Sequence, residues 1–306
     1  MTTTHATHAT PGAATSSSNN KARASEYKKN RLTLAGVVRS EWIKALSLRS
    51  IRWTLAVSIL LGVAMSAITA FALNEPIVGS ALPMTPTEYV LAVIAFPGTL
   101  LSFVFAILGV FVFSSEYASG MILSTLTAAP RRGYVIAAKA LVLTVISALG
   151  ALIVVGAGVG ISVLQIPEVA DVLGTEQVVT GMLGTVFFLV AIALFAFAVA
   201  GIVRSTAGAI TVVVGILFLV PMILQIMTGF VDWNWLVTVQ NYLPMTLGSN
   251  LGNGVTEALS LRVQMEQADS GYAEVLSYRD SALSLALWVI IPMAAAVKLF
   301  FSRDAK

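Results

Sequence analysis

Long runs of apolar residues, separated by short polar segments, make up most of the chain after about residue 50. Six of these runs reach the roughly 20 residues that a helix needs to cross the hydrocarbon core of a bilayer. They lie near 53–73, 89–113, 138–164, 179–203, 206–228 and 282–301. Because the runs are long and do not alternate between apolar and polar positions, they predict helices and not strands of a membrane barrel. The expected fold is an all-α polytopic membrane protein with six spans.

A shorter helical pattern precedes the first span, in residues 31–51. Its apolar stripe consists of Leu34, Val38, Trp42 and Ala45. Polar residues such as Arg39 and Lys44 lie off the stripe, whereas Glu41 falls close to it and weakens the separation. The pattern predicts an interfacial helix on the inner leaflet, anchored by Trp42 and by basic side chains. The alternative is that these residues are simply the positive flank of the first span.

Three other segments do not span. Residues 1–30 contain no apolar run, so their composition predicts a disordered tail and no signal peptide. Residues 122–128, in the loop after the second span, predict a helix too short to cross, and 255–268 predict a surface helix within the external segment 229–281. The external segment also holds Trp233, Trp235 and Tyr242, which read as an aromatic belt.

The composition excludes an ordinary soluble domain. Of the 306 residues, 57% are hydrophobic and 11% charged, against roughly 25% charged in soluble domains. With the N-terminus inside, cytoplasmic segments hold 16 of the 18 Lys and Arg residues and only 4 of the 15 Asp and Glu residues. The positive-inside rule therefore predicts that both termini are cytoplasmic. The net charge of +3 reflects this orientation and does not indicate a nucleic-acid partner.

Little in the chain suggests catalysis. There is no cysteine, and the two histidines, His5 and His8, lie in the N-terminal tail. No ionisable residue lies at the middle of a predicted span, which argues against a proton-coupled carrier. No G-x-x-x-x-G-K-[ST] loop is present to bind nucleotide phosphates. We therefore expect no enzyme activity, metal or cofactor on this chain, so that any ATP and Mg²⁺ would bind a partner subunit.

Glycine and proline residues mark features inside the spans. Gly156 and Gly160 have the small-xxx-small spacing that predicts close helix packing. Pro97-Gly98, Pro221 and Pro292 are expected to kink or break their helices. These positions are either hinges of a moving pathway or prolines of the kind common in membrane helices.

The loop after the second span carries the most specific motif. It reads Ser115-Glu116-Tyr117-Ala118-Ser119-Gly120-Met121, then Ser124-Thr125-Leu126, then Pro130-Arg131-Arg132, and finally Ala138-Lys139. This pattern resembles the first cytoplasmic loop of the permease subunits of ABC-2 type transporters. The segment R-S-E-W-I-K at 39–44 resembles the N-terminal helix of that family, and Tyr242-Leu243-Pro244 with Gly248 resembles its external segment. The resemblance covers residues 31–306, which form one transmembrane domain after the tail.

The resemblance implies an ATP-driven exporter of the bacterial plasma membrane. In that family two six-helix halves pair, here two copies of this chain or one copy and a paralogue, above two separate ATP-binding subunits. A short cytoplasmic coupling helix between the second and third spans, with the N-terminal helix, would contact the ATPase. The coupling residues would be Glu116, Tyr117, Gly120, Met121, Pro130, Arg131 and Arg132. Ala118 and Leu123 stand where relatives often carry a charge. The cargo would be a drug, natural product, peptide or lipid-like molecule.

Other interpretations stay open at this point. Arg131 and Arg132 could serve only to anchor the topology, and Glu116 could cap a helix. The chain could be an ATP-independent carrier or channel, or a membrane interaction subunit that transports nothing.

Overall fold

The computed structural model describes residues 33–74, 84–118, 132–230, 234–256 and 276–302. All regular secondary structure in these residues is helical. Six segments are long and apolar enough to cross a membrane. They are α3 (Arg49–Asn74), α4 (Pro86–Ala118), α6 (Arg132–Gln165), α8 (Glu176–Val203), a fifth span made of α9 (Thr206–Val214), η1 (Gly215–Leu219) and α10 (Val220–Thr228), and α14 (Tyr278–Ser302). The six predicted helical segments are therefore confirmed, and all but the fifth extend beyond the predicted bounds.

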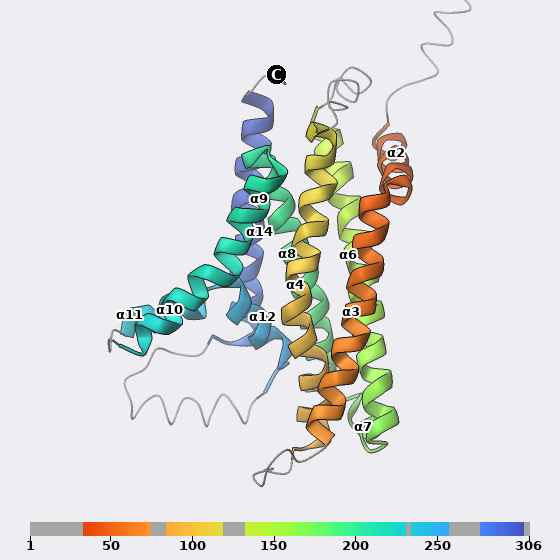
Figure 1. Cartoon of the computed structure of the whole chain (residues 1–306), viewed down its shortest axis with the longest axis vertical. Helices are drawn as coiled ribbons and strands as arrows, with labels where there is room; N and C mark the ends of the chain where they lie inside the picture. The colour runs from red at the N-terminus through yellow and green to blue at the C-terminus, as the bar shows by residue number, and fades with distance from the viewer. Residues whose placement is uncertain (1–32, 75–83, 119–131, 231–233, 257–275, 303–306) are drawn as a thin grey trace, which may run out of the picture.

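Five of the spans form an upright bundle, and the fifth in sequence leans away from it (Figure 1). Helix α2 (Leu34–Ser47) and the C-terminal end of α14 lie at one end of the bundle. The four-residue helix α7 (Val169–Val172), which links α6 to α8, lies at the opposite end. We call these the α2 end and the α7 end.

Helix α8 is the centre of the bundle. Within its most apolar window 67% of the residues are buried, compared with 17% in the fifth span and in α14. It packs on α4, α6, α9 and α14, with Phe197 in an edge-to-face contact with Phe113 of α4 at 5.1 Å between ring centroids. Glycine allows α4 to come this close, because a Cβ on Gly109 would lie 2.0 Å from the carbonyl oxygen of Ala193.

Part of the segment after the fifth span packs against the spanning helices. It contains α11 (Asn234–Asn241) and α12 (Pro244–Gly252), and α12 packs on α8, α14 and α4 with Leu247 and Leu251 fully buried. The indole Nε1 of Trp288 on α14 donates a hydrogen bond of 2.8 Å to the carbonyl oxygen of Tyr242. Trp233 and residues 257–268 of the predicted surface helix lie outside the described residues.

At two of the three prolines the helix is not broken, and a kink or hinge there stays a prediction. Helices α4 and α14 run uninterrupted through Pro97 and Pro292. A proline removes one backbone N–H donor, and a membrane helix tolerates this loss because its other backbone hydrogen bonds remain. Gly98 instead lies in close contact with α8, since a Cβ there would be 2.9 Å from Cγ2 of Thr185. Only Pro221 coincides with an irregularity, the π-helix η1 that ends two residues before it.

The predicted packing of Gly156 and Gly160 is not found within the described part of the chain. A Cβ at either position would meet no atom within 4 Å, and both residues are exposed on α6. Gly158, between them, is the glycine that packs, with the Ser66 hydroxyl 3.3 Å from the position of its Cβ.

Candidate functional site at the junction of α2, α4 and α6

Helix α2 begins with a side-chain cap and buries one of its faces. The Thr33 hydroxyl accepts a hydrogen bond of 3.2 Å from the backbone N–H of Gly36, which satisfies a donor of the first turn. Val37, Glu41 and Ala45 are the buried residues of this helix, spaced four apart on one face. An acidic residue therefore occupies the middle of a face that is otherwise apolar.

Two lysines neutralise this buried carboxylate. The ammonium of Lys139, on the second turn of α6, lies 2.7 Å from Oε2 of Glu41. The ammonium of Lys44, one turn further along α2, lies 2.8 Å from Oε1. The side chains of Glu41 and Lys139 are each only 6% exposed, whereas that of Lys44 is 29% exposed. The pair from Glu41 to Lys139 joins α2 to α6 across 98 residues of sequence.

The burial of this pair makes the junction sensitive to charge. Breaking a buried ion pair by removing one partner costs about 3–5 kcal/mol, because the remaining charge stays buried without its counter-ion. An exposed pair contributes only about 0.2–1 kcal/mol. Glu41 and Lys139 therefore hold α2 on α6, and Lys44 adds a weaker contact that solvent screens.

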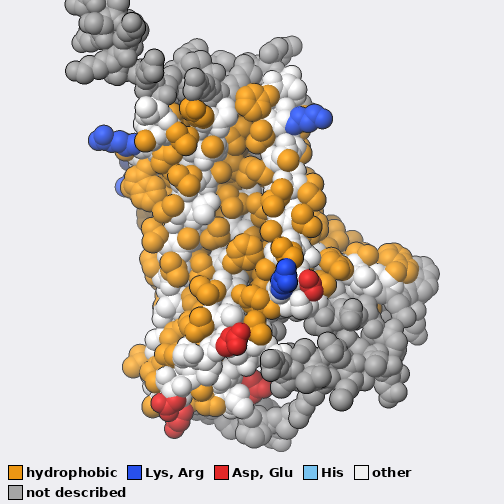
Figure 2. Space-filling model, turned by 180° about the vertical axis from the view of Figure 1, so that it is seen from behind, with side chains coloured by type: hydrophobic (Ala, Val, Ile, Leu, Met, Phe, Trp, Pro, Cys, Tyr) orange, Lys and Arg blue, Asp and Glu red, His pale blue; other side chains and the backbone are white. Residues whose placement is uncertain are grey.

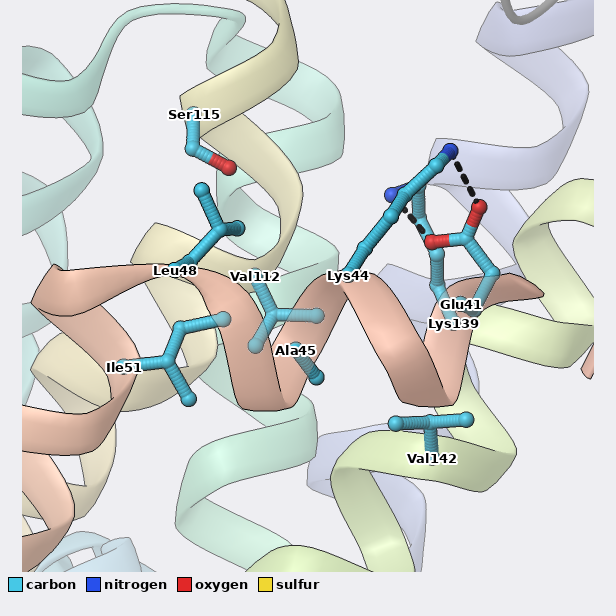
Figure 3. Close-up of a pocket in the computed structure, with 9 residues that line it drawn as sticks. All are labelled: Glu41, Lys44, Ala45, Leu48, Ile51, Val112, Ser115, Lys139 and Val142. Carbon is cyan, nitrogen blue, oxygen red and sulfur yellow. Dashed lines mark hydrogen bonds and ion pairs between the residues drawn. The ribbon is translucent and has the colours of Figure 1, made fainter. Parts of the chain in front are cut away.

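A small pocket lies directly beside the ion pairs (Figure 3). Its lining comes from α2, the start of α3, the end of α4 and the start of α6. Besides Glu41, Lys44 and Lys139, the lining residues are Ala45, Leu48, Ile51, Val112, Ser115 and Val142. Ser115 is the residue immediately before Glu116 of the loop motif. The junction therefore joins the N-terminal helix to both ends of the segment predicted to couple to a partner.

The structure describes only the edges of the predicted coupling loop. Glu116 and Tyr117 belong to the last turn of α4, and Arg132 is the first residue of α6, with their side chains outside the described set. Gly120, Met121, Pro130 and Arg131 lie outside the described residues, as do the predicted helix at 122–128 and the predicted tail at 1–30. The contacts of these residues stay predictions.

The predicted N-terminal helix is present as α2, and the four residues predicted to matter on it differ in exposure. Arg39 is exposed, Lys44 is half-buried, and Glu41 is buried. Trp42 is half-buried and packs in part against the main hydrophobic core, and its role as a membrane anchor stays a prediction. The placement of α2 on a membrane surface stays a prediction.

Sequence reasoning missed the partnership between Glu41 and Lys139. Two signals were available: Glu41 falls on the buried period of its helix, and Lys139 begins an apolar span at the same end of the predicted topology. A carboxylate on an apolar stripe needs a buried cation, yet spacing alone does not say which lysine supplies it.

Charges are segregated between the two ends of the bundle. On the face in Figure 2, most Lys and Arg side chains lie near the α2 end, and Asp and Glu side chains lie toward the α7 end. The helix termini at the α2 end carry Arg39, Lys44, Arg49, Arg52, Lys139, Arg204 and Lys298 together with Glu41, and those toward the α7 end carry Glu88, Glu168, Asp171, Glu176 and Asp280 together with Arg279. This is the pattern that the positive-inside rule associates with a cytoplasmic α2 end.

Comparison of the chain with models of known protein families and with curated protein sequences gives no match. Among the described residues, no group of three or more acidic or histidine side chains is placed to hold a metal ion.

Proposed function

We propose that this chain is the membrane-spanning permease subunit of an ATP-driven exporter, with the ATPase on a separate subunit bound at the α2 end. The observation that carries the proposal is the ion pair between Glu41 and Lys139. It joins the two sequence segments that resemble an ABC-2 type permease, the 39–44 motif on α2 and the end of the loop motif on α6. Segments that act together on one partner are expected to be linked in this way.

The arrangement supports a simple path for mechanical coupling. The 114–136 segment is continuous with α4 on one side and α6 on the other. In the proposed mechanism, ATP binding closes the partner's nucleotide-binding dimer and moves this segment. Helix α6 passes the movement to α2 through Glu41 and Lys139, and α4 passes it to the central helix α8, on which it packs. The charge segregation supports a cytoplasmic α2 end, where the ATPase would bind.

The fifth span is the natural moving element in this proposal. Helix α9 packs on α8 and α4, and η1 follows it with Leu217 buried in the core and Phe218 in an edge contact with Phe103 of α4. Helix α10 has no buried residue and, among the described elements, packs mainly on its neighbours η1 and α11. The π-helix η1 separates the two halves and gives the hinge predicted at Pro221 a physical basis. A second permease copy or a paralogue would complete the pathway alongside this chain.

The coupling role is tested by a Glu116→Ala, Arg131→Ala, Arg132→Ala triple variant. We expect it to insert into the membrane normally, because these residues precede or follow the apolar runs, and to uncouple ATP hydrolysis by the partner from transport. The measurement compares ATP turnover with cargo movement in reconstituted vesicles. Glu176→Ala, Arg279→Ala at the α7 end is the control and should stay coupled. Normal ATP-dependent transport by the triple variant would remove the loop from the mechanism.

A further inference from the structure

We propose that the elbow between α2 and α3 is a binding surface for anionic phospholipid headgroups. We define the elbow surface as the exposed residues Arg39, Ile43, Leu46, Arg49, Arg52 and Trp53. The inference uses the placement of α2 at the membrane but does not depend on ATP-driven transport.

The charged residues of the elbow surface are all basic. Arg39, Arg49 and Arg52 are exposed, and the described residues form no ion pair with them. The sole acidic residue of α2, Glu41, is buried on the opposite face and already bound by Lys44 and Lys139. The three guanidinium groups thus form a cationic surface without a neighbouring carboxylate on α2 or the first turn of α3.

The local geometry gathers these groups at a bend. Leu48 is extended, which ends α2, and its N–H still donates 3.0 Å to the carbonyl oxygen of Lys44. Helix α3 then begins directly at Arg49, so Arg49 and Arg52 lie one turn apart on the same side. The bend therefore joins α2, with Arg39 in its second turn, directly to Arg49 and Arg52 at the start of the first span.

Exposed apolar residues between the basic ones distinguish a lipid from an acidic protein as the partner. Trp53 is 71% exposed only four residues into a helix that is apolar through Leu73. Ile43 and Leu46, on the outer side of α2, are exposed as well. Tryptophan beside arginine at the end of a span is typical of the headgroup level, where the ring enters the interface and the guanidinium reaches phosphate. Arginine also binds phosphate with two hydrogen bonds at once.

Of the two tryptophans near the elbow, Trp53 is the more exposed, and we assign the ring at the headgroup level to it. Trp42 contacts the main core, whereas Trp53 lies on the exposed side of α3, one turn after Arg49. Each juxtamembrane Lys or Arg favours an anionic membrane surface by about fivefold, so three together should enrich anionic lipid around Trp53 by at least several-fold.

Quenching of Trp53 by brominated lipids tests the proposal. The purified full chain is placed in phosphatidylcholine nanodiscs with 20% phosphatidylglycerol, and the bromine atoms are carried either by part of the phosphatidylglycerol or by an equal amount of phosphatidylcholine. The contribution of Trp53 is the difference between the chain and its Trp53→Phe variant. We expect brominated phosphatidylglycerol to quench Trp53 several-fold more strongly, and 1 M salt to reduce that preference by screening.

The decisive variant is Arg39→Gln, Arg49→Gln, Arg52→Gln, which removes the cations and leaves the apolar residues and the Glu41 ion pairs in place. Its quenching by the two brominated lipids should become equal. The control is Lys298→Gln, Arg279→Gln, which removes charge elsewhere on the exposed surface; it should keep the preference. A preference that survives the triple substitution, or equal quenching of the unmodified chain by both lipids, would overturn the proposal. No ATPase is present, so neither outcome bears on the proposed transport function.

Discussion

The two ends of the bundle are held together by different chemistry. At the α2 end, the ion pair between Glu41 and Lys139 joins α2 to α6, and Lys44 pairs with the same carboxylate from within α2. At the α7 end, α12 sits on α8 through close backbone packing, where a Cβ on Gly184 would lie 2.2 Å from the carbonyl oxygen of Leu251. Neutral hydrogen bonds lie beside that contact: the hydroxyl of Thr180 accepts from the N–H of Val255 at 2.9 Å, and the carbonyl oxygen of Thr180 accepts from the hydroxyl of Tyr278, on α14, at 3.0 Å.

The contacts at the two ends respond to different kinds of perturbation. A buried ion pair depends on charge balance, so a partner that brings or withdraws charge can loosen it. A backbone contact at glycine depends on shape and is indifferent to charge. The proposed ATPase contact lies at the end where charge matters, and the α7 end is the rigid counterpart.

The largest effect is expected from Lys139→Met at the α2 end. Glu41 then stays buried with only the half-exposed Lys44 as its partner. The free energy of unfolding should fall by about 3–5 kcal/mol. Unfolding in mixed detergent, followed by circular dichroism, measures the change. Lys298→Met, which alters an exposed lysine on α14, is the matched control and should change it by less than about 0.5 kcal/mol.

At the α7 end the corresponding change is Gly184→Ala. The added methyl group must displace the backbone of Leu251, which should cost about 1–3 kcal/mol and loosen α12 first. Protection of the α12 amides against hydrogen exchange reports this local opening. Gly156→Ala is the control, because nothing lies within 4 Å of its Cβ position. Equal effects of the two substitutions would show that the contact between α8 and α12 does not require glycine.

The double variant Glu41→Met, Lys139→Met sharpens the interpretation of the α2 end. Replacing both members of a buried pair by apolar side chains is often neutral or stabilising, so most of the loss caused by Lys139→Met alone should be recovered. The same unfolding measurement completes a double-mutant cycle with Glu41→Met. Additive losses would mean that the two side chains do not interact in the folded protein.

The smallest effect is expected from Lys44→Met. Its ammonium is partly exposed, so solvent screens the contact with Glu41, and the loss should be below about 1 kcal/mol. A loss as large as that from Lys139→Met would contradict the unequal roles assigned to the two lysines.

The sequence predicted the spans better than it predicted the contacts between them. Each span is a local apolar run, so its position follows from length and hydropathy alone. The nine residues of α12 are too few to span, and nothing local shows that they pack inside the bundle. Pairing of Glu41 with Lys139 depends on how α2 and α6 meet, which no local pattern encodes. Gly156 and Gly160 are the converse case, because their spacing predicts packing where the described residues make no contact with the added Cβ positions.

The most direct test of the account is to purify the tagged chain from its native membrane in mild detergent and identify what accompanies it. We expect an ATPase with a Walker A loop to be purified in stoichiometric amount and to cross-link to residues 114–136 of this chain. The ATPase should be lost from the Glu116→Ala, Arg131→Ala, Arg132→Ala variant and retained by the Glu176→Ala, Arg279→Ala variant. Isolation of the chain without any ATPase, together with transport by vesicles that contain this chain alone, would contradict it.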